Sequence, residues 1–294
     1  MGKIYVLGSL NMDTTYYVEE LPVPGMTVSS FRTDKAEGGK GLNQCFAARW
    51  CGADTALIGS VGRDEDGCVM LDTLRRYGID ISHIARMDKT TGKAVIFVDK
   101  TGRNMIVIDG GANQFVPVEQ IKFQKGDWLI SQLETNLDAV KGYFKMARNC
   151  GAHTILNPSP YRELDSEVIA LTDLFIVNEC EASMLAGVPM DNVKQILQMK
   201  DKFKAKGIRR IVVTLGGEGA VVLDGEESSY IHGIKVKAVD TQGAGDVFAG
   251  VLTDSLNNGK TLYEACENAN RIAAKCVGIA GSTIVSMSAV KSRM

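Results

Sequence analysis

Asp240-Thr241-Gln242-Gly243-Ala244-Gly245-Asp246 is followed directly by the apolar segment Val247-Phe248-Ala249-Gly250-Val251-Leu252. The apolar segment predicts a helix, and the small residues before it allow a tight turn whose backbone N–H groups lie at the positive end of that helix. The pattern therefore predicts an anion site at Gly243, Ala244 and Gly245. Asp246 is either the helix N-cap, a position that Asp favours, or a catalytic base. These residues alone leave both interpretations open.

Short apolar runs alternate along the chain with longer helical patterns, which is typical of βαβ units around a parallel sheet. The predicted strands are Ile4–Leu7, Ala56–Ser60, Trp128–Ser131, Thr154–Leu156, Leu174–Val177 and Ile211–Thr214. The predicted helices are Leu42–Cys51, Gly67–Tyr77, Leu137–Cys150, Asn192–Lys206, Ala244–Leu256 and Leu262–Val277. No repeat or Pro/Gly-rich linker divides the chain, so we expect one α/β domain over residues 1–294.

Two segments, near residues 14–37 and 92–108, fit this alternation poorly. The second contains the run Ala94-Val95-Ile96-Phe97-Val98, and both segments predict β-hairpins. We expect a small sheet that projects from the main domain and acts as a lid. An exposed hairpin edge invites pairing, so we also expect a homodimer whose lids meet edge to edge.

The composition is that of an ordinary globular protein, with 294 residues, 45% apolar, 23% charged and a formal net charge of −2. The near-zero charge argues against nucleic acid as the main partner. The apolar run at the N-terminus is too short for a signal peptide or a membrane span. The seven cysteines form no CxxC pair and indicate reduced thiols. We therefore expect a cytoplasmic protein that does not bind membranes.

Polar side chains follow nearly every predicted core strand. Ligands of an open α/β sheet bind outside the carboxyl ends of its strands, so these side chains predict one shared cleft. For any single cluster, ordinary turn residues are the alternative explanation. The clusters are 9–13, 132–134, 157–158, 178–181 and 214–217.

A second glycine-rich segment, Gly38-Gly39-Lys40-Gly41-Leu42-Asn43-Gln44, also precedes a predicted helix. It matches neither a Walker A loop nor the dinucleotide fingerprint GxGxxG. It offers a close backbone approach and two side-chain amides that donate and accept hydrogen bonds, which suits a polyhydroxylated ligand. A tight strand-to-helix turn is the alternative explanation for the first two glycines.

The two glycine-rich segments, in this order and spacing, resemble the signatures of the ribokinase-like (PfkB) family of carbohydrate and nucleoside kinases. The resemblance covers essentially the whole chain, and further matches lie at 8–13, 111–113, 132–134, 156–160 and 178–181. It implies a three-layer α/β domain with a mainly parallel sheet and a small β-sheet lid. It also implies an ATP-dependent sugar kinase, with the primary 5-hydroxyl of D-ribose as the expected acceptor. The alternatives are 2-deoxyribose, fructose or adenosine as acceptor, or a sugar-binding regulatory protein without catalysis.

The resemblance further implies roles for individual residues. Asp246 is the expected general base, beside an anion hole made by Gly243, Ala244 and Gly245. The expected sugar-binding residues are Asn11, Asp13, Gly39, Lys40, Asn43, Glu134 and Asp246. The expected ATP-binding residues are Asn178, Thr214, Gly216, Gly217, Gly245 and Asn270, and Glu181 is expected to bind Mg²⁺ through water. Lys40 as a solvated lysine and Asn270 as a helix surface residue remain open alternatives.

A monovalent cation, K⁺, is also implied beside the anion hole. Its expected surroundings are Asp240, Gln242, Cys276, Ile279, Gly281 and Val285. The chain departs from the family here, because Val285 stands where a hydroxyl is expected. Many ligands of such a site are backbone carbonyls, so we expect activation by K⁺ to survive this change.

Overall fold

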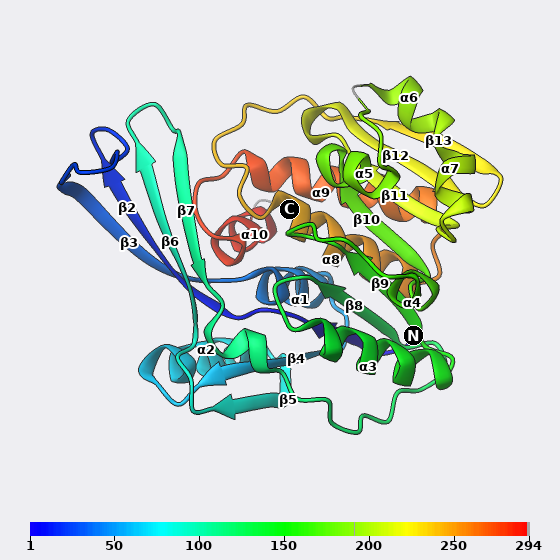
Figure 1. The fold of residues 1–294 in the computed structure, drawn as a ribbon, viewed down its shortest axis with the longest axis horizontal. Helices are drawn as coiled ribbons and strands as arrows, with labels where there is room; N and C mark the ends of the chain where they lie inside the picture. The colour runs from blue at the N-terminus through cyan, green and yellow to red at the C-terminus, as the bar shows by residue number, and fades with distance from the viewer. Residues whose placement is uncertain (191, 293–294) are drawn as a thin grey trace.

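The computed structural model describes residues 1–190 and 192–292, and within them the chain forms two separate β-sheets (Figure 1). The larger sheet makes the centre of the main body, and the smaller sheet projects away from it. The smaller sheet is formed by the two segments that the sequence set apart from the βαβ alternation. The prediction of a main α/β sheet with a small additional sheet is therefore confirmed.

The larger sheet has nine strands within the described residues. In spatial order they are β13 (Glu227–His232), β12 (Gly219–Asp224), β11 (Arg210–Thr214), β10 (Leu174–Asn178), β9 (His153–Asn157), β8 (Trp128–Gln132), β1 (Ile4–Leu7), β4 (Thr55–Gly62) and β5 (Asp80–Met87). Neighbouring strands from β11 to β5 are parallel. At the other edge β12 runs antiparallel to both β11 and β13. The sheet is thus mainly parallel, as predicted, although β5, β12 and β13 were not predicted.

Helices cover both faces of this sheet (Figure 1). One face carries α1 (Lys40–Cys51), α2 (Glu65–Arg76), α8 (Ala244–Asn257), α9 (Leu262–Val277) and α10 (Thr283–Ser292). The other carries α3 (Leu137–Asn149), α4 (Ser166–Ala170), α5 (Glu179–Ala186), α6 (Val193–Gln198) and α7 (Lys200–Ala205). Because side chains alternate along a strand, Ile4 and Val6 join the first core while Tyr5 and Leu7 join the second. The predicted three layers are confirmed.

Some predicted elements differ from the structure. The single helix predicted over 192–206 is wrong, because the helical conformation is interrupted at Met199 (φ −82°, ψ −2°), where α6 ends and α7 begins. Helix α10, from Thr283 onward, was not predicted, and it is stabilised by burial of Ile284, Met287 and Val290. All seven cysteines are free thiols. No helix in the described part of the chain is long and apolar enough to cross a membrane.

The small sheet has the strand order β3-β2-β6-β7. Its strands are β2 (Asn11–Val18), β3 (Ser30–Gly38), β6 (Gly92–Asp99) and β7 (Asn104–Asp109). The sheet meets the main domain at Asn11, which pairs in register with Gly38 on one side and Gly92 on the other. Gly39 (φ +96°) then turns the chain from β3 into α1. The small sheet is therefore anchored directly beside the carboxyl end of β1.

Candidate active site

Strand β1 is the point at which the order of the large sheet reverses. The chain adds β4 and β5 on one side of β1, and later adds β8 to β11 on the other side. Ligands of open α/β sheets bind beside such a reversal, outside the carboxyl ends of the strands. Ser9 follows β1 and Glu134 follows β8, and the hydroxyl of Ser9 donates a hydrogen bond to the Glu134 carboxylate. Two of the polar clusters predicted to share a cleft are thus in contact.

The residues expected to bind sugar converge from several elements. The backbone N–H of Lys40, at the start of α1, donates to Glu134 Oε2 at 3.2 Å. Asn11 Oδ1 accepts from Asn113 Nδ2 at 2.8 Å, and Asn113 Oδ1 accepts from the backbone N–H of Leu10 at 2.9 Å. Both asparagines are buried. The amide pair holds the loop after β1 in one conformation.

Asp13 is a carboxylate with an unused acceptor. Its Oδ1 atom is buried and has no hydrogen-bond partner among the described residues. Burial, together with the negative charge of Glu134, raises the pKa of Asp13 from 3.8 to about 7. A Cβ atom at Gly38 would lie 2.1 Å from Asp13 Oδ2, so the glycine makes room for this carboxylate. The site can thus accept hydrogen bonds from the hydroxyl groups of a ligand.

Asp246 is the third residue of α8, and its side chain does not cap that helix. The N-cap is Gly243 (φ +72°), so the interpretation of Asp246 as an N-cap is wrong. The side chain of Asp246 is buried. Its Oδ2 atom accepts from Asn43 Nδ2 at 3.2 Å, and its Oδ1 atom accepts from Gln44 Nε2 at 3.0 Å. Both donors belong to α1, so the two glycine-rich segments meet at this carboxylate.

The predicted anion hole lies at the start of α8. The N–H of Ala244 donates to the carbonyl of Thr241 at 3.3 Å, which closes the turn. The following N–H groups, of Gly245 and Asp246, lie in the first turn of the helix, where no intrahelical acceptor exists. A Cβ atom at Gly245 would meet nothing within 4 Å, so the space beside it is open. The N–H of Ala244 is thus used within the turn, whereas those of Gly245 and Asp246 face no acceptor within the helix.

A pocket of ≈ 630 Å³ begins at this helix end. It contains five of the six residues expected to bind ATP: Thr214, Gly216, Gly217, Gly245 and Asn270. Its remaining walls include the apolar residues Phe248, Ala273 and Val277, together with the segment from Ile234 to Ala238. The sixth expected residue, Asn178, pairs in register with Thr214 at the carboxyl ends of β10 and β11. The pocket thus combines apolar walls with the backbone at the start of α8.

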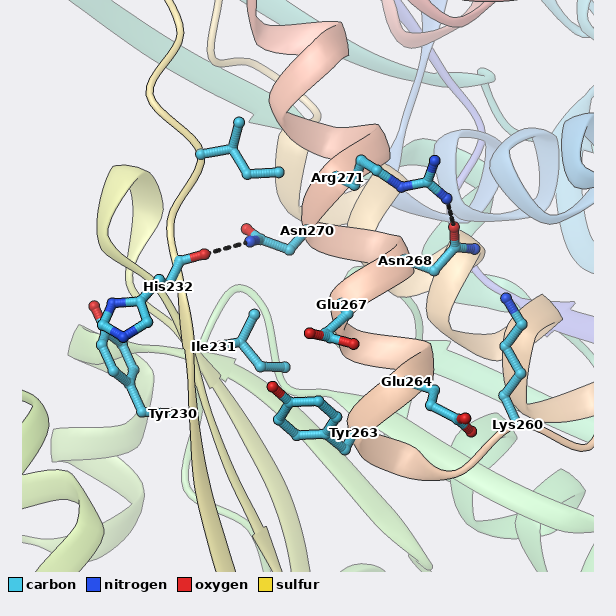
Figure 2. A pocket seen from close by; sticks show the side chains of 11 residues that line it. Tyr230, Ile231, His232, Lys260, Tyr263, Glu264, Glu267, Asn268, Asn270 and Arg271 are labelled. Atoms are coloured by element: carbon cyan, nitrogen blue, oxygen red, sulfur yellow. Dashed lines mark hydrogen bonds between the residues drawn. The ribbon is translucent and has the colours of Figure 1, made fainter.

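Asn270 lines both this pocket and a neighbouring one, which is shown in Figure 2. The neighbouring pocket has a volume of ≈ 550 Å³ and lies between β13 and α9. In Figure 2, Asn270 extends from α9 toward β13, where its Nδ2 atom donates to the carbonyl of His232 at 3.0 Å. Asn270 therefore connects α9 to β13 and lines both pockets.

Asn178 and Glu181 have a local structural role at the start of α5. Asn178 Oδ1 accepts from the N–H of Glu181 at 2.8 Å, and Glu181 Oε2 accepts from the N–H of Asn178 at 3.0 Å. This capping box explains both residue types without a ligand.

The negative charge of Asp246 raises the pKa of half-buried Lys40 against the effect of burial, and Glu134 and Glu181 contribute in the same direction. The Lys40 ammonium therefore lies in the field of all three carboxylates.

Four of the residues expected around the monovalent cation lie in two adjoining loops, and a fifth, Cys276, lies in the last turn of α9. Asp240 joins these loops, because its Oδ1 atom accepts from the N–H of Gln242 at 3.0 Å and its Oδ2 atom accepts from the N–H of Gly281 at 3.2 Å. At the end of α9, the carbonyl of Cys276 accepts from the N–H of Ile279 at 2.9 Å. No group of three or more His, Cys, Asp and Glu within the described ranges could hold a metal ion.

Val285, the sixth of these residues, lies in the first turn of α10 with a half-exposed side chain. The buried hydroxyl closest to the anion hole belongs instead to Thr283, whose Oγ1 atom would lie 2.3 Å from a Cβ at Gly243. This hydroxyl has no hydrogen-bond partner among the described residues.

Three residues that had no individual role in the predicted site take part in its hydrogen bonds: Ser9, Gln44 and Asn113. Each lies in a segment that carries the family resemblance. Gln44 was expected to suit a polyhydroxylated ligand, but its side chain is fully buried and its amide contacts Asp246. The residue type alone does not show toward which neighbour a side chain points.

Comparisons with known proteins agree with this architecture. A model of the pfkB family carbohydrate kinases matches residues 1–289. The ribokinase of Staphylococcus aureus (strain COL) is 33% identical over 284 residues, which cover 94% of this chain and 93% of that protein. The bifunctional ribokinase/ribose-5-phosphate isomerase A of Fructilactobacillus sanfranciscensis is 38% identical over 263 residues. That match covers 87% of this chain, which spans only 49% of the bifunctional protein.

The solved structures give the same result. Arabidopsis thaliana ribokinase, complexed with ribose and ATP, matches this structure with a TM-score of 0.89 at 27% sequence identity. The match covers 99% of this chain and 98% of that one. From the family model and the identity to curated relatives, this chain belongs to the pfkB family of carbohydrate kinases.

Proposed function

We propose that this carbohydrate kinase transfers the γ-phosphoryl group of ATP to the primary 5-hydroxyl of D-ribose, giving D-ribose 5-phosphate and ADP. One observation carries the proposal. The buried carboxylate of Asp246 is hydrogen-bonded to Asn43 on the side expected to bind sugar. The residues just before it, Ala244 and Gly245, line the 630 Å³ pocket expected to bind ATP. The first turn of α8 therefore lies between the residues expected to bind the sugar, which accepts the phosphoryl group, and the pocket expected to bind ATP, which donates it.

In the proposed reaction, Asp13, Asn11 and Glu134 orient the sugar through its hydroxyl groups. The carboxylate of Asp246 accepts the proton of the 5-hydroxyl while the oxygen of that hydroxyl bonds to the γ-phosphorus. The bond from this phosphorus to the oxygen shared with the β-phosphate breaks, and ADP leaves with that electron pair. The N–H groups of Gly245 and Asp246 and the ammonium of Lys40 stabilise the negative charge on the transferred group.

The residues present fit the two cations that the family implies. Glu181 uses Oε2 in the capping box, which leaves its second oxygen for a water-mediated contact with Mg²⁺. When bound, Mg²⁺ would neutralise charge on the phosphates of ATP. The unpartnered Thr283 hydroxyl and the Asp240 carboxylate supply oxygen atoms for K⁺ beside Gly243. The hydroxyl that Val285 lacks is thus available two residues earlier in the chain.

The choice of D-ribose rests on the relatives and on Asp13. The matched Staphylococcus aureus protein is named a ribokinase, and the matched Arabidopsis structure holds ribose and ATP. The unpartnered carboxylate of Asp13 suits a sugar with neighbouring hydroxyl groups. A deoxyribokinase of Salmonella typhi is also 32% identical over 254 residues, so 2-deoxyribose is the acceptor to compare.

We further propose that two copies of the chain associate through the small sheet. Strand β7 is an edge strand of that sheet, and its residues from Met105 to Ile108 are apolar and exposed. An exposed apolar edge strand is a template for pairing with another chain. This arrangement would place two projecting sheets against each other.

The proposed reaction is tested by the initial rate of ADP release from MgATP in a coupled assay. Parallel reactions hold D-ribose, 2-deoxyribose, fructose or adenosine, in potassium chloride and in tetramethylammonium chloride. We expect a rate that depends on D-ribose, far exceeds the others and requires potassium. Activity with another acceptor alone would overturn the substrate, silence with every acceptor would overturn catalysis, and equal rates in both salts would overturn the role of K⁺.

The role of Asp246 is tested by Asp246→Asn, which keeps the shape of the side chain and removes its basicity. A positioned base contributes ~10²–10⁴ in rate, so kcat should fall by that factor. ATP affinity, measured by calorimetry, should stay within about threefold, because the amide has the same shape as the carboxylate and leaves the ATP pocket intact. A variant that keeps most of its kcat would remove Asp246 from the reaction.

A further inference from the structure

Gln44 is a buried amide that links Asp246 to the centre of the large sheet. Its side chain is 0% exposed. Its Nε2 atom donates to Asp246 Oδ1 at 3.0 Å and to Asn157 Oδ1 at 3.1 Å. Its Oε1 atom accepts from Gln132 Nε2 at 2.6 Å. Every hydrogen-bonding atom of this amide is therefore used, and one bond ends on the proposed base.

The direction of this hydrogen-bond chain is fixed by the backbone. Asn157 Nδ2 donates to the carbonyl of Ile176 at 2.8 Å, and a carbonyl only accepts. Asn157 must therefore present its oxygen to Gln44, and Gln44 must present its NH₂ group to both Asn157 and Asp246. This series of hydrogen bonds thus presents Asp246 with an N–H donor and never with an acceptor.

Packing prevents Gln44 from taking another position. Helix α1 lies against α8 at Gly250, where a Cβ atom would be 2.4 Å from the carbonyl oxygen of Gln44. At its other side, α1 touches the loop after β1, since a Cβ at Gly41 would be 2.4 Å from the carbonyl carbon of Gly8. The backbone that carries Gln44 is thus confined between a strand end and the helix of Asp246.

We propose that Gln44 is a positioning residue, which holds the carboxylate of Asp246 in the orientation needed to accept the proton of the substrate hydroxyl. The proposal rests on the proposed role of Asp246 as base. A buried amide must recover the cost of leaving water, and an apolar residue of similar size would fill the same volume without that cost. The bond to Asp246 gives this amide a functional reason to be present.

The test is a double-mutant cycle with Gln44→Met, which keeps the length of the side chain and removes its hydrogen bonds. Misplacing a reacting group by about 1 Å can cost 10²-fold, so kcat should fall ~10–100-fold while the KM values for ATP and sugar stay within about threefold. In the Asp246→Asn background, measured by single turnover, the same change should alter the rate by less than about twofold, because no base remains to be positioned.

Either of two results would overturn the proposal: an equal loss in both backgrounds, which indicates a general structural role, or an unchanged kcat in the Gln44→Met single variant. Asn257→Leu is the matched control, because Asn257 bonds to Gly2 at the far end of α8, with distances of 3.0 and 2.8 Å. It should lower stability and leave kcat unchanged. The comparison does not require the Asp246→Asn variant to be fully inactive. A native enzyme that is inactive with every acceptor would contradict the proposed function and not the role of Gln44.

Should Gln44→Met fail to fold, Gln132→Met tests the same connection from one residue further away. Gln132 is buried and bonds to Gln44 Oε1, while its own Oε1 atom has no partner among the described residues. A loss of kcat of about twofold to tenfold is expected, again absent in the Asp246→Asn background. An equal loss in both backgrounds, or no loss, would contradict the positioning role.

Discussion

Asp13 is a carboxylate that the fold buries close to a second carboxylate, Glu134, and its pKa is about 7. The neutral acid is thus the main form at pH 6, and the carboxylate is the main form at pH 8. A carboxylate accepts hydrogen bonds from two sugar hydroxyls, whereas the neutral acid is a poorer acceptor. We expect the KM for D-ribose to fall about tenfold from pH 6 to pH 8, in proportion to the ionised fraction.

This prediction is checked with saturating ATP, because ATP itself titrates in the same range. Asp13→Asn is the control: it should have a higher KM for D-ribose at pH 8, and that KM should not change between pH 6 and 8. A native KM that stays constant over this range would show that Asp13 does not control sugar binding through its charge.

Sequence reasoning at the residue scale succeeded where a motif fixes the backbone and was incomplete where side-chain direction matters. It placed Asp246 beside a helix start but left the N-cap open, and only the position of Gly243 as N-cap excludes that alternative. It identified the segment that contains Gln44 but did not predict the hydrogen bond between Gln44 and Asp246, because the two residues lie 202 positions apart along the chain. Contacts of this kind depend on how α1 and α8 pack.

At the scale of elements, the contact between α1 and α8 holds the two glycine-rich segments together. Gly250 allows this approach, since an added Cβ would lie 2.4 Å from the carbonyl oxygen of Gln44 and 2.6 Å from the Cβ of Ala47. Alanine favours a helix by about 1 kcal/mol over glycine, but overpacking typically costs 1–3 kcal/mol. We expect Gly250→Ala to lower the free energy of unfolding by about 1 kcal/mol and kcat by about tenfold or more, because Asp246 moves relative to α1.

Urea unfolding and steady-state kinetics measure these two effects. Gly278→Ala is the matched control, because Gly278 has an ordinary backbone conformation (φ −77°) and the first atom that its Cβ would meet is 3.5 Å away. The stability of this control should change by less than about 0.5 kcal/mol. If Gly250→Ala keeps both native stability and native kcat, the close packing of the two helices does not position the site.

The elements that the sequence did not predict depend on tertiary contacts and on strand direction. Helix α10 depends on burial of Ile284, Met287 and Val290 against the core, which local helix propensity does not reveal. The antiparallel pairing of β12 and β13 follows from their short connection, which allows a hairpin but not a parallel crossover. An apolar run by itself does not indicate whether its strand lies parallel or antiparallel to the neighbouring strands.

At the scale of the whole molecule, the sequence predicted the layers and the small sheet because both follow from periodicity. Alternation of strands and helices requires a covered parallel sheet, and the two segments without that alternation formed the second sheet. Periodicity does not reveal which edge of a sheet stays uncovered. In the structure, β7 forms such an edge, and its residues Met105, Ile106, Val107 and Ile108 are 46%, 50%, 62% and 51% exposed.

These four residues alternate between the two faces of the small sheet, so the strand is apolar on both faces. Pairing with a second copy would cover them and use the free hydrogen-bonding groups of the edge. We expect multi-angle light scattering at micromolar concentration to give twice the mass of one chain, and Val107→Lys to give the mass of one chain, because the charge opposes burial of the strand. Val118→Lys is the control, since Val118 is an exposed valine that lies beside Gly142 of α3, and the mass of this variant should stay doubled. A native protein with the mass of one chain would contradict association through β7, and an undiminished mass for Val107→Lys would place the interface elsewhere.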